Sequence, residues 1–233
     1  MKAKQDWIEK AKKDAALEAV KHVKDGFVVG LGSGSTAAHA IEEIGKKIKR
    51  EGLHVLGVPT SYQAFALAVK YGVPITTLEE HPTIDLAIDG ADQIDKKLNL
   101  IKGMGGALAR EKIVAYASKR FVIIADKTKK VNILVENNHP VPIEVLPFAT
   151  PVLMRKLKEM SGNAVLREEP KKVGPVITDN GNVIVDVDFG PIPTPAALEC
   201  KLEGLVGVVE TGLFVEMADI VYIGRSSGVE KFV

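Results

Sequence analysis

The sequence predicts an α/β fold in which a Rossmann-like parallel sheet covered by helices is joined to a smaller ferredoxin-like α+β domain. Over about the first 130 residues, short apolar runs alternate with helical patterns, which is typical of parallel strands buried on both faces. The order of elements then changes to β-α-β-β-α-β, the split arrangement of ferredoxin-like domains. A chain of 233 residues, 46% of them hydrophobic, is long enough for both domains.

The first domain is expected to begin with a helix, because Trp7, Ile8, Ala11 and Ala15 recur at helical spacing and Gly26 follows as a C-terminal breaker. Alternating strands and helices continue from there. The expected order is a helix over 5–24, a strand over 27–31, a helix through Ile41, Ile44 and Ile48, a strand over 54–58, a helix over 61–71, strands over 73–78 and 84–88, a helix over 106–118 and a strand over 121–125.

The second domain is expected over residues 131–207, where prolines and a turn at 179–182 punctuate the chain. Its expected elements are a strand over 141–146, a helix over 151–160, strands over 164–168 and 183–187, a helix over 195–203 and a strand over 207–212. The apolar run at 220–224 again has the character of a parallel strand. Residues 1–130 and 208–233 are therefore assigned to one discontinuous domain.

Composition excludes several classes of partner. With 31 basic and 30 acidic residues, the chain has no bulk field for nucleic acid or an anionic membrane. No apolar window is long enough for a membrane span, and the N-terminus is too charged for a signal peptide. Cys200 is the only cysteine and the five histidines lack ligand spacing, so we expect a cytoplasmic protein without a disulfide or a metal site.

A loop rich in glycine and hydroxyl groups lies between the first expected strand and the helix after it. Glycines let the backbone approach a ligand, and a helix N-terminus offers free N–H groups to a phosphate. A tight turn with a Ser/Thr helix cap is the alternative. The loop lacks the third glycine of a dinucleotide site and the Walker lysine, which favours a small phosphorylated metabolite over NAD or ATP. Its candidate ligands are Ser33, Gly34, Ser35 and Thr36.

Two carboxylates, Asp89 and Asp92, come directly after the strand expected over 84–88, with Gly90 and Ala91 between them. Ligands of open parallel sheets bind beyond the carboxyl ends of the strands, so this position favours contacts to substrate hydroxyls. An Asx turn or a helix cap is the alternative, and the spacing does not fit a calcium loop.

A third segment carries a candidate cation and a candidate base. Lys102 precedes a turn containing Gly103, Met104 and Gly105, and it could stabilise a developing oxyanion. Glu111 follows on the next helix, where the residues three and four positions away are apolar. Desolvation of a carboxyl raises its pKa, as a general base requires. Pairing with Arg110, Lys112 or a distant residue is the alternative.

Residues 125–130 follow another parallel strand and could bring a lysine to the same phosphate, although a solvated charged loop is equally compatible with the sequence.

Several linked motifs resemble one known family over about the whole chain. They are VVGLGSGSTAAHAIEEIG, IDGADQID, IKGMGGALAREKIVA, ADKTKKV, TDNGNVIVDV and GLFVEMADIVYIG, and together they are similar to ribose-5-phosphate isomerase of type A. The resemblance implies a cofactor-free aldose–ketose isomerase of the pentose phosphate pathway, which interconverts ribose 5-phosphate and ribulose 5-phosphate through an enediolate. It also implies a homodimer or homotetramer, with the smaller domain at subunit contacts.

The resemblance assigns roles to the candidate residues. Glu111 would be the proton-shuttling base, Lys102 would stabilise the enediolate, and Asp89 and Asp92 would contact the sugar and assist ring opening. The phosphate would be held by the serine- and glycine-rich loop together with Lys129, and Lys12 is a further candidate for it. Met104 stands where many relatives have glycine. The implied substrate contacts are Ser33, Gly34, Ser35, Thr36, Gly90, Ala91, Gly103, Met104, Gly105 and Lys129.

Two other classes of function are weaker alternatives. A sugar-phosphate sensor would share the phosphate loop, but it usually needs a DNA-binding helix pair, and the first 25 residues offer one helix. An acyl-CoA-type transferase is not supported by a phosphate loop this small. Sensor and enzyme differ in chemistry, so turnover of ribose 5-phosphate distinguishes them.

Overall fold

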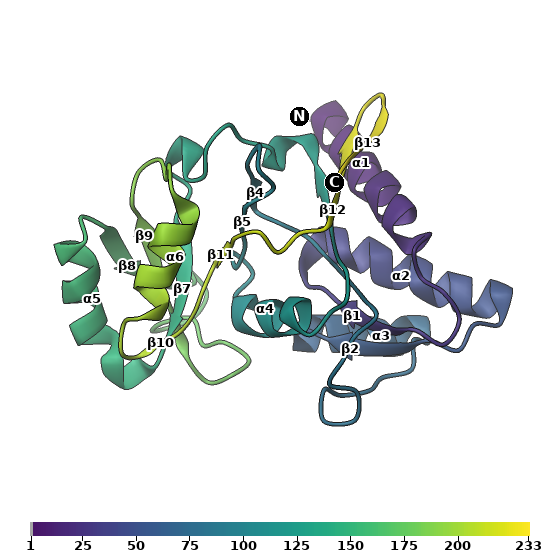
Figure 1. Ribbon diagram of the computed structural model, residues 1–233, viewed down its shortest axis with the longest axis horizontal. Helices are drawn as coiled ribbons and strands as arrows, with labels where there is room; N and C mark the ends of the chain where they lie inside the picture. The colour runs from purple at the N-terminus through teal and green to yellow at the C-terminus, as the bar shows by residue number, and fades with distance from the viewer. Residues whose placement is uncertain (1) are drawn as a thin grey trace. The chain divides into compact units, whose positions relative to one another are not determined.

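The computed structural model describes residues 2–233 of the chain, which fall into two compact units (Figure 1). The first unit contains the residues up to Ala91, residues Arg110–Lys129 and residues Met217–Val233. The second contains Asp92–Ala109 and Lys130–Glu216. Among the described residues, no helix is both long enough and apolar enough to cross a membrane.

The first unit is built on a six-stranded sheet in the order β13-β12-β6-β3-β1-β2. Every neighbouring pair is parallel except β12 and β13, which form an antiparallel hairpin at one edge. The bounds are β1 (Val28–Leu31), β2 (Leu56–Pro59), β3 (Leu86–Asp89), β6 (Phe121–Asp126), β12 (Ile220–Arg225) and β13 (Gly228–Phe232). The predicted parallel sheet is therefore confirmed.

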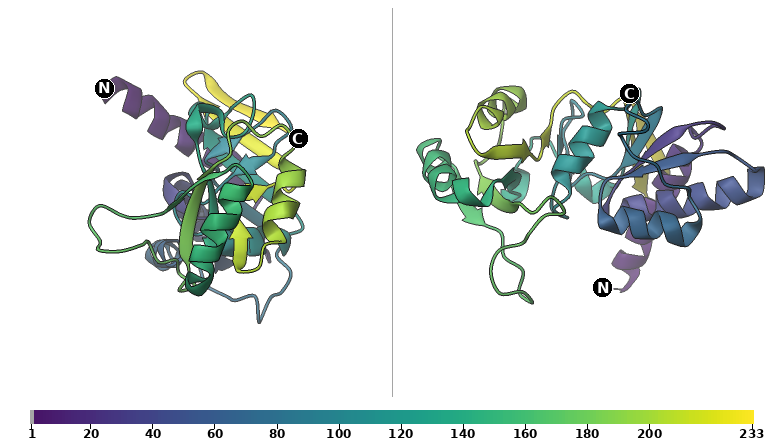
Figure 2. Two further views of the ribbon diagram at one scale, coloured as in Figure 1. Left: turned by 90° about the vertical axis from the view of Figure 1, so that its left-hand side faces the viewer. Right: turned by 90° about the horizontal axis from the view of Figure 1, so that it is seen from below.

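Helices cover both faces of this sheet (Figure 2). Apolar side chains of α1 (Lys2–Val20), α2 (Gly34–Glu51) and α3 (Tyr62–Tyr71) form one core with alternate residues of β1, β3, β6 and β12. On the opposite face, Val114 of α4 (Leu108–Tyr116) packs against Gly30, where an added Cβ would lie 2.5 Å from the Val114 side chain.

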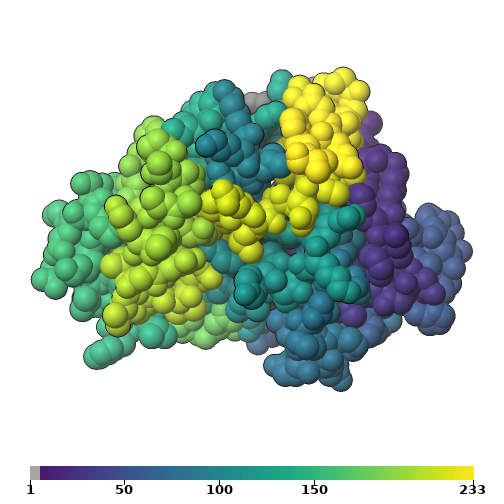
Figure 3. All heavy atoms as spheres, viewed as in Figure 1, coloured from purple at the N-terminus to yellow at the C-terminus, as the bar shows by residue number. Residues whose placement is uncertain are grey.

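The packing of α1 on β12 is especially close. A Cβ added to Gly224 would lie 2.0 Å from the carbonyl oxygen of Ala11, so only glycine fits at this position of β12. Figure 3 shows the purple α1 and the yellow β13 hairpin side by side on the surface of this unit. The first helix of the chain thus packs on the last two strands of the chain, within the first unit.

The second unit has the ferredoxin-like order predicted from the sequence. Its four-stranded antiparallel sheet runs β10-β7-β9-β8, and two helices complete the β-α-β-β-α-β unit. The bounds are β7 (Val141–Val145), α5 (Thr150–Glu159), β8 (Asn163–Leu166), β9 (Val183–Asp188), α6 (Pro195–Glu203) and β10 (Val208–Thr211). Short 3-10 helices occur at η1 (Lys127–Lys129) in the first unit and at η2 (Glu136–Asn138) and η3 (Pro147–Ala149) in the second.

A small third sheet places the boundary between the two units at other residues than the sequence predicted. Its strands β4 (Gln93–Ile94), β5 (Leu100–Ile101) and β11 (Leu213–Phe214) were not predicted, because two-residue strands leave no periodic pattern. Through them residues 92–109 join the second unit, which extends to Glu216, whereas the sequence placed 92–109 in the first domain and began its return at residue 208.

The prediction of a strand over 73–78 was wrong. Only Ile75 forms an isolated bridge, to Gly57 of β2. Pro74 contributes no N–H, and the hydroxyl of Thr76 bonds to the side chains of Glu80 and His81. The segment therefore turns away after one bridge. The hairpin strand β13 was also missed, since its exposed and half-buried residues carry little apolar signal.

Candidate active site

The phosphate loop, Asp89 and Lys129 of the first unit lie at the carboxyl ends of its parallel strands. The loop after β1 leads into α2, and its Gly32 N–H donates to the carbonyl of Ile88 in β3 over 3.0 Å. Gly32 is packed tightly there, because an added Cβ would lie 2.1 Å from Oδ1 of Asp89. The loop and Asp89 are therefore held together by a contact that only glycine permits.

Asp89 is almost fully buried at the end of β3, and it organises the backbone around it. Its Oδ1 accepts the N–H of Ser33 over 3.1 Å and the N–H of Gly90 over 2.7 Å. The bond to Gly90 joins adjacent residues and is not an Asx turn, in which the carboxylate accepts the N–H two residues on. The bond to Ser33, 56 residues away in sequence, joins the two predicted motifs.

The hydroxyl of Ser33 does not cap the helix that it precedes. Ser33 is the N-cap residue of α2, yet its Oγ lies 2.8 Å from Oγ1 of Thr60 and 2.6 Å from Oγ of Ser61. The N–H of Gly34 donates instead to Oε1 of Gln63 over 2.8 Å. Since α2 also has no acidic residue in its first turn, its N-terminus keeps the positive character that suits an anion.

Lys12 adds a cation to this loop. Its Nζ donates to Oγ of Ser35 over 3.1 Å and to Oε1 of Glu9 over 2.7 Å. The hydrogen bond from Lys12 holds the pKa of Glu9 below its ordinary value, so Glu9 remains charged and balances the ammonium. A lysine 23 residues upstream thus reaches the candidate phosphate loop.

Glu111 and Lys129 belong to the same unit. Glu111 lies in the first turn of α4 with 6% of its surface exposed, as its apolar helical neighbours predicted. Lys129 is half-buried at the end of η1, a turn fixed by Asp126, whose Oδ1 accepts the backbone N–H of Thr128 over 2.8 Å and also its hydroxyl. The lysine turn follows β6, at the carboxyl edge of the sheet.

The remaining candidates belong to the second unit. Lys102 is 3% exposed, and its Nζ lies 5.5 Å from the centre of the Phe214 ring. Its backbone N–H donates to the carbonyl of Gly212 over 2.9 Å. An aromatic face attracts a lysine ammonium, and burial confines the side chain to one place, as a fixed cation requires.

The turn after Lys102 depends on glycine. Gly103 and Gly106 have φ values of +104° and +77°, in the region that other residues rarely adopt. Between them, the N–H of Met104 donates to Oδ2 of Asp92 over 3.0 Å. Met104 itself is partly exposed, and its sulfur lies 3.9 Å from Nη2 of Arg167.

The candidates are thus distributed over both units. The first unit holds the phosphate loop, Asp89, Gly90, Ala91, Glu111 and Lys129, and the second holds Asp92 and Lys102 to Gly105. Sequence reasoning missed the residues whose side chains form hydrogen bonds with Ser33 and Gly34 of the phosphate loop. They are Thr60, Ser61 and Gln63. Their position directly after β2 was the available signal, because polar residues at a strand's carboxyl end belong to the same edge.

Comparisons with known proteins agree on one family. The family model for ribose 5-phosphate isomerase A (phosphoriboisomerase A) matches residues 56–228. The ribose-5-phosphate isomerase A of Methanosarcina acetivorans is 48% identical over 222 residues, covering 95% of this chain and 93% of that protein.

Solved structures give the same result. The ribose 5-phosphate isomerase A of Methanocaldococcus jannaschii is 47% identical and matches with a TM-score of 0.92, covering 96% of this chain and 98% of that one. A D-ribose-5-phosphate isomerase in complex with phospho-erythronic acid is 46% identical and matches with a TM-score of 0.94, covering 97% and 98% of the two chains.

Proposed function

The chain belongs to the ribose-5-phosphate isomerase A family and is an aldose–ketose isomerase of the pentose phosphate pathway, and we propose that it interconverts D-ribose 5-phosphate and D-ribulose 5-phosphate with Glu111 as its base. The observation that carries the assignment of the base is the burial of Glu111 in the first turn of α4, within the segment that resembles the family. A buried carboxylate is poorly solvated and therefore suited to remove a proton from carbon.

The proposed reaction moves one proton between neighbouring carbons. Glu111 removes the proton from C2 of the open-chain aldose, and the C2–H electron pair forms the enediolate as the C1 carbonyl oxygen becomes negative. Lys102 stabilises that charge, and the proton of the C2 hydroxyl passes to the C1 oxygen. Protonated Glu111 then returns its proton to C1 as the C2 carbonyl forms, which gives the ketose. Asp89 and Asp92 contact the sugar hydroxyls and assist ring opening, while Gly90, Ala91, Gly103, Met104 and Gly105 contribute backbone contacts. A fixed cation and a desolvated base are the two groups that this chemistry needs.

The activity is tested by incubating the protein with ribose 5-phosphate in EDTA and measuring formation of the ketose. The same experiment tests the expected independence from metal and cofactor. Formation of ribulose 5-phosphate at an unchanged rate with EDTA supports both. Binding of ribose 5-phosphate without turnover would instead favour a sugar-phosphate sensor. Turnover that EDTA abolishes would contradict the metal-free mechanism but not the reaction.

The phosphate is proposed to bind at the N-terminus of α2. Ser33, Gly34, Ser35 and Thr36 form this site, and Lys12 and Lys129 supply positive charge. Ser35 and Thr36 supply the N–H and hydroxyl groups, because the N–H groups of Ser33 and Gly34 already donate to Asp89 and Gln63. Support comes from the bond between Lys12 and Ser35, and from the Ser33 side chain, which makes no capping bond to α2.

Removing Lys129 is therefore expected to weaken substrate binding. In Lys129→Ala, KM for ribose 5-phosphate should rise roughly 10-fold while kcat changes little, because a charge-assisted contact to the phosphate is lost in ground and transition states alike. Initial rates over a range of substrate concentrations measure both constants. Lys127→Ala, an exposed lysine of the same turn, is the matched control and should behave as wild type. Unchanged kinetics in Lys129→Ala would contradict its role.

We propose a homodimer or homotetramer that associates through the second unit, and the cytoplasm as its compartment. The second unit exposes a set of apolar side chains around the end of β7, including Leu146, Phe148, Val152 and Val206. The N–H of Leu146 donates to the carbonyl of Gly207, which brings Val206 to Leu146, and Phe148 and Val152 follow Leu146 in sequence on η3 and α5. Phe148 is 99% exposed, which favours a partner surface. The reducing cytoplasm suits Cys200, which is free and exposed.

Phe148→Asp is expected to lower the molar mass in solution, since a charge would be buried at the proposed interface. Size-exclusion chromatography with light scattering measures this mass. The matched variant Phe65→Asp alters a partly exposed phenylalanine of α3 in the first unit and should leave the mass unchanged. Dissociation by Phe65→Asp alone would place the interface on the first unit instead.

A further inference from the structure

Arg167, directly after β8 in the second unit, has no part in the proposed mechanism, yet its guanidinium group contacts the turn that follows Lys102. We propose that Arg167 is a positioning residue, which fixes this turn and thereby the place of the Lys102 ammonium. The proposal deepens the proposed function, since it rests on the role of Lys102 in stabilising the enediolate.

The guanidinium group bridges the sheet and the turn. Nη1 donates to the carbonyl of Gly103 over 2.8 Å and to that of Met104 over 3.0 Å. On its other side, Nε donates to Oδ2 of Asp186 over 2.7 Å, and Nη2 donates to Oδ1 of the same carboxylate. One planar cation therefore holds two consecutive carbonyls and a bidentate carboxylate.

Both members of the ion pair are anchored on the antiparallel sheet. The Arg167 N–H donates to the carbonyl of Ile184 in β9 over 2.8 Å, and Asp186 of β9 pairs with Val165 of β8. The side chains are 11% and 20% exposed. Because the pair is shielded and rests on two paired strands, it provides a rigid base for the turn.

The turn needs such a constraint because its glycines leave the backbone many accessible conformations. Three of the four residues that follow Lys102 are glycines, two of them with positive φ. A planar trans peptide points its N–H opposite to its C=O, so fixing the carbonyl of Gly103 toward Arg167 also turns the Met104 N–H toward Asp92. Arg167 thus sets the orientation of the peptide group whose N–H donates to Asp92.

Lysine could not replace this arrangement. The ammonium of lysine is a compact point charge, whereas the four contacts of Arg167 need N–H groups in the fixed plane of a guanidinium. The ion pair with Asp186 alone would survive in a lysine variant. The two carbonyl contacts would not be made together, so this variant separates the fold-stabilising pair from the positioning of the turn.

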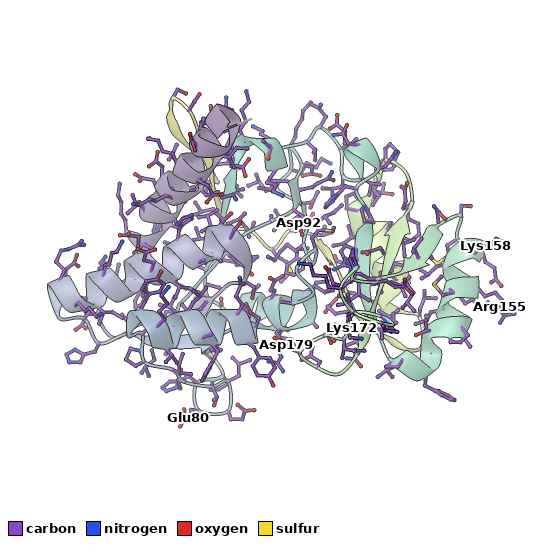
Figure 4. The ribbon with its side chains drawn as sticks, turned by 180° about the vertical axis from the view of Figure 1, so that it is seen from behind. Glu80, Asp92, Arg155, Lys158, Lys172 and Asp179 are labelled. Carbon is purple, nitrogen blue, oxygen red and sulfur yellow. The ribbon has the colours of Figure 1, made fainter. Side chains whose placement is uncertain are left out.

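The test compares Arg167→Ala and Arg167→Lys with Arg155→Ala. Figure 4 shows Arg155 at the outer side of α5, and its side chain is 70% exposed, so its removal from the same unit is a matched control. For Arg167→Ala we expect kcat to fall roughly 10- to 100-fold, because small displacements of a catalytic group have effects of this size. KM should change by less than about 3-fold, because the phosphate contacts are untouched. Arg155→Ala should match wild type.

Added guanidinium ion, well below the concentration that unfolds the protein, should restore part of kcat in Arg167→Ala but not in Lys102→Ala. A merely structural role would not give such rescue. Arg167→Lys should retain the wild-type unfolding temperature and still lose kcat, and it decides the question if Arg167→Ala does not fold. Wild-type kcat in Arg167→Lys, or a loss of kcat that follows the loss of stability without rescue, would overturn the proposal. Normal turnover in Lys102→Ala would instead refute the proposed function of that lysine.

Discussion

Glu111→Gln is expected to lower kcat for ribose 5-phosphate isomerisation by roughly 10²- to 10⁴-fold, the range over which general base catalysis contributes. Glutamine has nearly the same shape as glutamate but cannot accept the C2 proton. The buried position in α4 should therefore remain filled, and the fold should remain intact. Stopped and continuous assays of ketose formation measure the loss.

Binding should survive in this variant, because the phosphate is proposed to be held by other residues. Isothermal titration with ribose 5-phosphate should give a dissociation constant close to the KM of the wild type. Glu43→Gln, which alters a glutamate paired with Lys46 on α2, is the control for the loss of one carboxylate. Normal turnover in Glu111→Gln would refute the assignment of the base, and weakened binding with intact kcat would assign Glu111 to substrate contact instead.

Gly32→Ala is expected to damage both the site and the stability of the first unit. The new Cβ would lie 2.1 Å from Oδ1 and 2.6 Å from Cα of Asp89, so β3 itself must move and not only a flexible side chain. Overpacking of this kind costs about 1–3 kcal/mol of unfolding free energy. The shift would also displace the carboxylate that binds the Ser33 N–H, and kcat/KM should fall at least roughly 100-fold.

Urea unfolding and initial rates at low substrate concentration measure the two effects of Gly32→Ala. Gly204→Ala is the matched control, because its Cβ would make an ordinary 3.5 Å contact at the end of α6. Its unfolding free energy should stay within about 0.5 kcal/mol of wild type. If Gly32→Ala kept wild-type activity, the close packing of the loop on Asp89 would not matter for the reaction.

The parts of the fold that sequence predicted are those where several residues repeat one pattern. β1, β3 and β6 are continuous apolar runs, and α2 and α3 end at Gly52 and Gly72, each in the left-handed conformation. β5 and β11 have two residues each, and they form only because tertiary structure brings Leu213 opposite Ile101. Pairing of that kind depends on the distant partner, which no local pattern contains.

The site shows the same division. Asp89 and the phosphate loop were predictable because each follows an apolar strand, and Glu111 because a charge stood among apolar helical neighbours. Arg167 lies in a polar segment after β8, where an arginine is unremarkable as sequence. Its contacts with Gly103 and Asp186 arise from the pairing of β8 with β9 and from the return of residues 102–104 to the same unit.

The packing of Gly224 on Ala11 has a consequence for the order in which the protein folds during synthesis. β12 leaves the ribosome only after the whole of the second unit, yet it lies between β6 and β13 and beneath α1. Until β12 is made, one edge of β6 and part of the apolar face of α1 have no covering partner. The second unit is complete in the nascent chain by Glu216, so we expect it to fold first. The first unit can close only when its last strands have been translated.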